Sequence, residues 1–122
     1  MFRISIDNTR NLLTITIDGH FDIAQAEQLY ADAEKIVPTC VKGFYVLTDL
    51  SSLESMDVAV CPFLVKTMEL CNSHGVSKVI RVIPDATKDI GFNIMSLFHY
   101  SPQVKIHTFR SLAEAEEHLA NP

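Results

Sequence analysis

The hydrophobic pattern of this 122-residue chain changes its period at residue 22, and that change strongly constrains the fold. Before it, residues 3–7 (RISID) and 12–18 (LLTITID) alternate between apolar and polar residues, which is typical of half-buried strands. The polar residues 8–11 between them predict a hairpin loop. After it, apolar residues recur at the spacing of an α-helix that begins at Asp22. The chain is therefore predicted to start with an antiparallel hairpin and a helix.

Two further apolar runs predict buried inner strands, a last strand follows them, and helical patterns separate and follow these strands. The strands are expected at residues 44–50, 78–83 and 104–109, and the helices at 59–74, 87–98 and 111–120. Nearly continuous apolar runs are typical of strands that helices cover on both faces. The order ββαβαβαβα requires a largely parallel sheet, because strand–helix–strand units return in the same direction. We expect an α/β fold with a mixed five-stranded sheet, an N-terminal antiparallel hairpin and four helices, in a single domain over residues 1–122.

Polar residues mark the expected helix ends. Asp22 with Gln25, and Ser111 with Glu114, have the spacing of a capping box, in which a side chain bonds the free N–H groups of the first turn. Gly75 is expected to end the second helix. The residues of the last helix that we expect to be buried are Leu112, Ala115 and Leu119.

The charge and the cysteines limit the classes of function. The net charge is −5 and the basic residues are scattered, which argues against nucleic acid as a partner. Three cysteines without C-x-x-C spacing favour free thiols and a reducing compartment. No apolar run approaches the ~20 residues of a membrane span, and residues 1–10 do not resemble a signal peptide. We therefore expect a cytoplasmic protein that binds neither nucleic acid nor membranes.

Sequence patterns of catalytic and cofactor sites are missing from the chain. It has no phosphate-binding glycine loop, no nucleophile elbow and no H-E-x-x-H pattern. None of the five histidines pairs with another at i+4, so no metal site is predicted. Cys61 and Cys71 are expected to act as small buried apolar residues of the second helix. The sequence predicts a protein that is not an enzyme and holds no cofactor.

Two stretches together resemble the STAS domain, the family of the anti-sigma-factor antagonists. Residues 14–22 (TITIDGHFD) resemble the strand of that family that ends in Gly-x-hydrophobic-Asp before the first helix. Residues 46–57 (VLTDLSSLESMD) resemble its second signature, a buried strand that ends in Asp-Leu-Ser, then a short loop and an acid that opens the next helix. The order of the elements matches over nearly the whole chain. The resemblance implies a regulatory protein-interaction module.

The chain departs from the STAS pattern at the position of the regulatory serine. The family typically has Asp-Ser-Ser-Gly or Asp-Ser-Thr-Gly at the mouth of the second helix, where a partner kinase phosphorylates the serine. The matching residues here are Asp57, Val58, Ala59 and Val60. Valine and alanine have no hydroxyl group, so the resemblance implies a divergent member that cannot be phosphorylated at this position. A phosphate there would add a charge of about −1.5 to −2 at the start of a helix. Valine cannot be phosphorylated, so the charge at this position cannot be changed in that way.

The loop before the second helix holds most of the predicted partner-binding residues. Ser51, Ser52 and Ser55 are either displaced phosphoacceptors or, in the reading we favour, loop and capping hydroxyls. In that reading Ser51 forms a capping box with Glu54, and Ser55 or Asp57 caps the helix. Asp49 ends a buried strand, near the usual ligand site of an open α/β sheet. The alternative that we favour for Asp49 is a solvated carboxylate that orders the loop.

A second surface is predicted on the helix expected at residues 87–98. Phe92, Met95 and His99 fall on one side of it, opposite the residues that face the core. An apolar stripe on a surface helix is typical of a dimer or partner contact, and the alternative is that residues 100–103 or a bend in the helix cover it.

These observations favour a non-catalytic regulatory module that binds a protein partner. By resemblance alone, the partner is an anti-sigma-type kinase or another regulator, and a homodimer is a further prediction. The alternative function is a domain that binds or senses a lipid-like or nucleotide ligand. The predicted partner-binding residues are Asp22, Asp49, Ser51, Ser52, Ser55, Met56, Asp57, Val58, Ala59, Phe92, Met95 and His99. The sequence names neither the partner nor the ligand.

Overall fold

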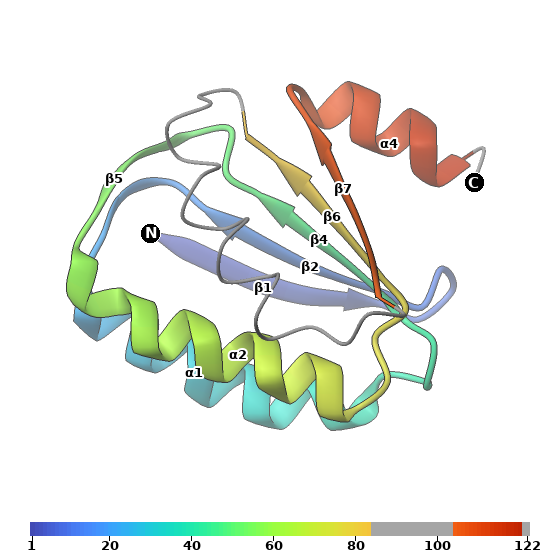
Figure 1. Ribbon diagram of the computed structural model, residues 1–122, viewed down its shortest axis with the longest axis horizontal. Coiled ribbons are helices and arrows are strands. Elements are labelled where there is room, and N and C mark those ends of the chain that lie inside the picture. Colours follow the sequence, from blue (N-terminus) through green and yellow to red (C-terminus); the bar gives the residue numbers. More distant parts are fainter. Residues whose placement is uncertain (84–103, 121–122) are drawn as a thin grey trace.

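The computed structural model describes residues 1–83 and 104–120 and contains a five-stranded sheet with helices on both faces (Figure 1). The strands of this sheet are β1 (Phe2–Asp7), β2 (Leu12–Ile17), β4 (Tyr45–Asp49), β6 (Lys78–Val82) and β7 (Lys105–Phe109). Their order is β1-β2-β4-β6-β7. β1 is antiparallel to β2, and the other neighbours are parallel. The predicted mixed five-stranded sheet with an N-terminal hairpin is confirmed.

Two long helices cover one face of the sheet, and a shorter helix lies on the other face. α1 (Ile23–Ile36) and α2 (Cys61–Ser73) lie side by side, and α4 (Leu112–Ala120) packs on the opposite side (Figure 1). The 3₁₀ turns η1 (Val37–Thr39) and η2 (Val58–Val60) adjoin α1 and α2. Three of the four expected α-helices are thus present in the described ranges. The helix expected at residues 87–98 lies outside them.

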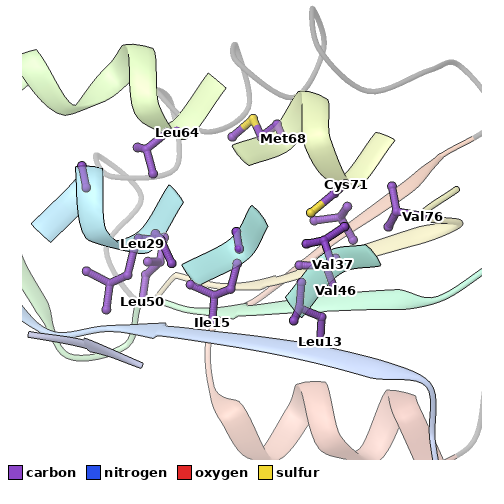
Figure 2. Packing of buried hydrophobic residues seen from close by; sticks show 14 of the residues in the cluster. Leu13, Ile15, Leu29, Val37, Val46, Leu50, Leu64, Met68, Cys71 and Val76 are labelled. Atoms are coloured by element: carbon purple, nitrogen blue, oxygen red, sulfur yellow. The ribbon is translucent and has the colours of Figure 1, made fainter. Parts of the chain in front are cut away.

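The main core fills the space between the sheet and the pair α1 and α2. Leu13 and Ile15 of β2 belong to this cluster together with Leu29 of α1 and Leu64 of α2 (Figure 2). Ile17, the next alternate residue of β2, belongs to it as well. Each of these residues is at most 5% exposed, and full burial of such a side chain stabilises the fold by about 1.5–3 kcal/mol. A smaller cluster lies on the other face and consists of Leu12, Leu47, Ile80, Val82 and Ala115. The two clusters explain why the inner strands are apolar on both faces.

The packing of α4 agrees only partly with the prediction. Ser111 Oγ accepts a hydrogen bond of 3.2 Å from Glu114 N, so the predicted cap is confirmed. Ala115 is fully buried and Leu119 packs against the smaller cluster. Leu112 was expected to be buried, but it is 40% exposed. Leu112 is the first residue of the helix, and the packed face of α4 is limited to the residues that follow it.

Two histidines meet where α4 contacts β7. The rings of His107 and His118 lie 4.8 Å apart between centroids. Lys78 Nζ lies 3.4 Å from His118 Nε2. Burial, reinforced by these neighbouring groups, lowers the pKa of His107 below its ordinary value. Folding therefore favours the neutral form of His107.

The second helix begins later than the prediction placed it. It was expected from Ala59, but α2 starts at Cys61 because the preceding turn is the 3₁₀ helix η2. Pro62 lies in the first turn, where its missing N–H breaks no helical hydrogen bond. Gly75 follows the helix with a φ of +91°, and its N–H bonds Asn72 O at 3.2 Å. The predicted role of Gly75 as the cap is confirmed.

A short second sheet was not predicted. β3 (Gly19–Phe21) and β5 (Leu53–Met56) form a two-stranded parallel sheet at one end of the molecule. The predicted capping box of Ser51 and Glu54 is wrong, because residues 53–56 are a strand and no helix starts there. Strands this short show no clear alternation, and pairing between distant segments decides their structure.

Candidate functional site

The two stretches that carry the family resemblance meet in space. β3 pairs with β5, so that His20 lies opposite Ser55 and Phe21 lies opposite Met56. Gly19 N donates to Ser52 O at 3.0 Å. We call residues 20–23 and 51–59 the tip, since they form a continuous surface at the carboxyl ends of β2, β3 and β4. Ligand sites of open α/β sheets lie at such strand ends.

His20 bridges the two strands of the tip. Its Nδ1 lies 2.7 Å from Ser55 Oγ, and its Nε2 lies 3.1 Å from Asp57 Oδ1. The side chains of His20 and Asp57 are each half exposed. Asp57 N also donates to Phe21 O at 3.1 Å. The imidazole therefore fastens β5 to β3 through both ring nitrogens. His20 is not among the predicted partner-binding residues, and the signal for it in the sequence is its place between Gly19 and Phe21 in the first stretch.

The acids of the tip are used in different ways. Asp22 Oδ1 accepts a hydrogen bond of 2.9 Å from Gln25 N, which confirms the predicted cap of α1. The side chain of Gln25 does not close the capping box but donates to His20 O at 3.0 Å. Either Ser55 or Asp57 was expected to cap the second helix. Asp57 occupies the N-cap of η2 but makes no side-chain cap bond, because its carboxylate faces His20 instead.

Asp49 holds the loop that follows β4. Its Oδ1 accepts hydrogen bonds from Ser51 N at 3.0 Å and from Ser51 Oγ at 2.6 Å. The loop-ordering role predicted for Asp49 is confirmed. The description of its carboxylate as solvated is wrong, because Asp49 is 9% exposed and the loop folds back over it. Ser51 and Ser52 lie on the surface beside it.

The tip has exposed apolar side chains. Val58 is 86% exposed, Ala59 is exposed and Ile23 is 43% exposed. Met56 is half-buried at their base. Val60, only two residues after Val58, is fully buried. The turn η2 therefore presents Val58 to solvent while Val60 is packed in the core.

The charged side chains of the tip are acidic. Residues 11–34 and 43–65, which supply β3, β5 and η2, contain no Lys or Arg. The acidic residues of the tip are Asp22, Glu54 and Asp57. Acidic side chains on a surface repel acidic partners and attract basic ones. The tip thus combines exposed apolar side chains with acidic ones.

A small cavity lies in the main core between β2, β4 and β6 and the helices α1 and α2. It is lined mainly by apolar side chains, among them Ile15, Val46 and Met68, and its volume is about 40 Å³. Pockets that hold drug-sized ligands measure about 300–1,000 Å³. The cavity is therefore too small for the lipid-like or nucleotide ligand of the alternative function.

Other kinds of site find little support in residues 1–83 and 104–120. Burial raises the pKa of the Cys71 thiol to about 12, so this thiol stays protonated and unreactive at neutral pH. No cluster of three or more His, Cys, Asp or Glu residues in these ranges could hold a metal ion. None of the helices described there is long and apolar enough to cross a membrane. The predicted surface of Phe92, Met95 and His99 lies outside the described residues.

Comparisons with known proteins agree with the fold. The family model for the STAS domain matches residues 3–115. An uncharacterised protein of Shewanella loihica PV-4 with a SpoIIAA-like fold has a TM-score of 0.72 at 15% identity, and the match covers 97% of this chain and 93% of that one. The anti-sigma factor antagonist SpoIIAA in its unphosphorylated form has a TM-score of 0.68 at 17% identity over 100% of both chains. The phosphorylated form of the Bacillus protein SpoIIAA has a TM-score of 0.67 at 18% identity, over 98% of this chain and 99% of that one. A search of the curated proteins found no match.

Proposed function

Because this chain belongs to the STAS domain family, we propose that it is a non-catalytic regulatory module that binds a protein partner through the tip. The observation that carries the proposal is Val58, an apolar side chain that is 86% exposed on the turn η2. A contiguous exposed apolar surface with a polar border is typical of a protein interface. The similar protein SpoIIAA is an anti-sigma factor antagonist, which supports the same class of function here.

The partner that fits this surface has an apolar socket with basic residues around it. The socket would receive Val58 and Ala59, and the basic residues would face Asp22, Glu54 and Asp57. Charge complementarity of this kind raises the association rate and selects against acidic competitors. In the family pattern the partner is a kinase, and an anti-sigma-type kinase or another regulator is the partner we propose.

Binding at the tip is not switched by phosphate at the position of the family's regulatory serine. Val58 and Ala59 stand there and carry no hydroxyl group. SpoIIAA, in contrast, has been solved in a phosphorylated and an unphosphorylated form. A permanently apolar residue at this position keeps the surface competent to bind, so that the partner's abundance or another signal sets the occupancy.

Affinity capture from the native cell lysate tests the proposal. The baits are the wild-type chain, Val58→Asp, and Val41→Asp as a matched control, because Val41 is 69% exposed and lies outside the tip. We expect one partner to be retained by the wild type and by Val41→Asp and lost by Val58→Asp. Equal retention by all three baits contradicts binding through the tip. Mass spectrometry of the bait then examines Ser51, Ser52 and Ser55, and phosphate on any of them contradicts the proposal that the switch is absent.

A further inference from the structure

The outer edge of β1 faces no other strand within the described part of the chain, because β1 is an end strand of the sheet. Met1 and Asp18 exchange two hydrogen bonds, from the Met1 amino group to Asp18 O at 2.9 Å and from Asp18 N to Met1 O at 2.8 Å. Bonded and non-bonded pairs alternate along antiparallel strands, so the odd-numbered residues of β1 bond β2. The N–H and C=O groups of Phe2, Ile4 and Ile6 therefore point to the free edge.

Three of the devices that protect a free edge against pairing with another chain are missing from β1. Proteins block exposed edges with lysine, proline or a β-bulge. β1 contains neither lysine nor proline, and its register with β2 runs without a bulge. An open groove of about 570 Å³ adjoins it, and its lining consists of Phe2, Arg3, Ile4 and Ser5 of β1, Thr14 and Thr16 of β2, and Asp32 of α1. The edge therefore has both free backbone groups and space for a further strand.

The sequence of β1 is complementary to itself when a second copy runs antiparallel. Its centre reads Arg3-Ile4-Ser5-Ile6-Asp7, and a two-fold axis through Ser5 brings Arg3 of one copy opposite Asp7 of the other. The same axis places Ile4 opposite Ile6. We propose that two copies of this chain associate through β1 in this register and form one continuous sheet across the dimer.

The backbone groups and the charges select the same register. Ile4 and Ile6 become hydrogen-bonded pairs, because their N–H and C=O groups point outward. Arg3 and Asp7 fall at non-hydrogen-bonded positions, where facing side chains approach most closely. A shift of two residues in either direction places Arg3 opposite Ser5 or Thr9 and loses both ion pairs. The pattern of opposite charges therefore favours a second copy over an unrelated strand.

The side chains of the strand suit this arrangement as well. Arg3 is exposed and turned toward the face that carries Ser5. Asp7 Oδ1 accepts hydrogen bonds from Thr9 N and Arg10 N, and its Oδ2 pairs with Arg10 Nε at 2.9 Å, so the carboxylate is held in place at the end of the strand. A carboxylate can accept about four hydrogen bonds, so one position is left for an arginine from the second copy, which would share Asp7 with Arg10. Ile4 and Ile6 lie on the face that packs against the main core, and their partners would extend that face.

Sedimentation velocity across micromolar to millimolar concentrations tests the dimer. We compare the wild type with Arg3→Asp, and with Lys105→Asp as a control that makes the same charge change on the exposed side of β7 at the opposite edge. We expect the wild type and Lys105→Asp to dimerise, and Arg3→Asp to raise the dissociation constant about tenfold, because two ion pairs become two repulsions. A wild type that is monomeric at every concentration, or an unchanged dissociation constant in Arg3→Asp, overturns the proposal.

Cysteine cross-linking tests the register independently of the charges. In the proposed register Ser5 faces Ser5 of the second copy, so Ser5→Cys should form an intermolecular disulfide under a copper–phenanthroline oxidant. Arg3→Cys faces Asp7 and should cross-link no more than the wild type, whose three cysteines provide the background. Equal cross-linking of the two variants overturns the register. Capture of a strand from another protein at this edge, with the chain itself monomeric, overturns self-association.

Discussion

Replacing His20 with alanine should loosen the tip and leave the rest of the fold closed. The change removes the contacts of the imidazole with Ser55 Oγ at 2.7 Å and with Asp57 Oδ1 at 3.1 Å. Both contacts are half exposed to water, so each contributes about 0.5 kcal/mol rather than the larger value of a buried pair. Together they stabilise the closed tip by about 1 kcal/mol, and their loss raises the local opening constant about fivefold.

Amide hydrogen exchange measures this opening residue by residue. Asp57 N–H bonds Phe21 O across the small sheet, whereas Leu50 N–H bonds Val82 O in the main sheet. We expect His20→Ala to accelerate exchange at Asp57 about fivefold and to leave Leu50 unchanged. His74→Ala, which changes an exposed histidine beyond the end of α2, serves as the matched control and should alter neither amide. Unchanged exchange at Asp57, or equal acceleration at both amides, would refute the reasoning.

Three further predictions concern the stability of the fold. Val46→Ile adds a methylene beside the 40 Å³ cavity and should raise the free energy of unfolding by about 0.5–1 kcal/mol in urea titrations, since a cavity costs about 24 cal/mol per Å³. Val37→Ile, at a fully buried position that does not line the cavity, should lower it by about 1 kcal/mol or more, and equal effects of the two variants would contradict this reading. Because the pKa of His107 is lowered, the folded state binds fewer protons at this residue than the unfolded state. The contribution of neutral His107 to stability is therefore present above the unfolded pKa and is lost as the pH falls through the folded pKa. When the pH is lowered from 7.5 to 5.5, the unfolding midpoint should fall further for the wild type than for His107→Gln. Ser51→Ala removes the hydroxyl that donates to the buried Asp49 and keeps the hydrogen bond from the backbone N–H, so it should lower the free energy of unfolding by about 1–2 kcal/mol. A loss below a few tenths of a kcal/mol would show that water replaces the hydroxyl.

The strands of the main sheet could be predicted from the sequence because their pattern is long and consistent. Alternation in RISID and LLTITID located β1 and β2 to within a residue at each end, and the apolar run at 78–83 located β6. In each of these strands the apolar residues that pack against the core form a regular pattern, and that pattern is visible in the sequence. The predicted caps at Asp22 and Ser111 were correct for a similar reason, since the bond spans only three residues.

The tip could not be predicted in the same way. β3 and β5 have three and four residues, and each is stabilised by a partner more than 30 residues away. The serine and the acid at positions 51 and 54 have the spacing of a helix cap, yet the buried carboxylate of Asp49 binds the serine instead. His20 became a site residue only when folding brought Ser55 and Asp57 to its ring. Sequence motifs indicated where the surface lies, and long-range contacts determined its geometry.

The turn η2 passes from solvent to the interior within two residues, from Val58 to Val60. Evolution can therefore vary the outward valine to suit a new partner while the inward valine continues to anchor the turn. Surface substitutions of this kind usually change the free energy of unfolding by less than about 0.5 kcal/mol. Members of the family can in this way diverge in what they recognise without first acquiring a compensating mutation elsewhere.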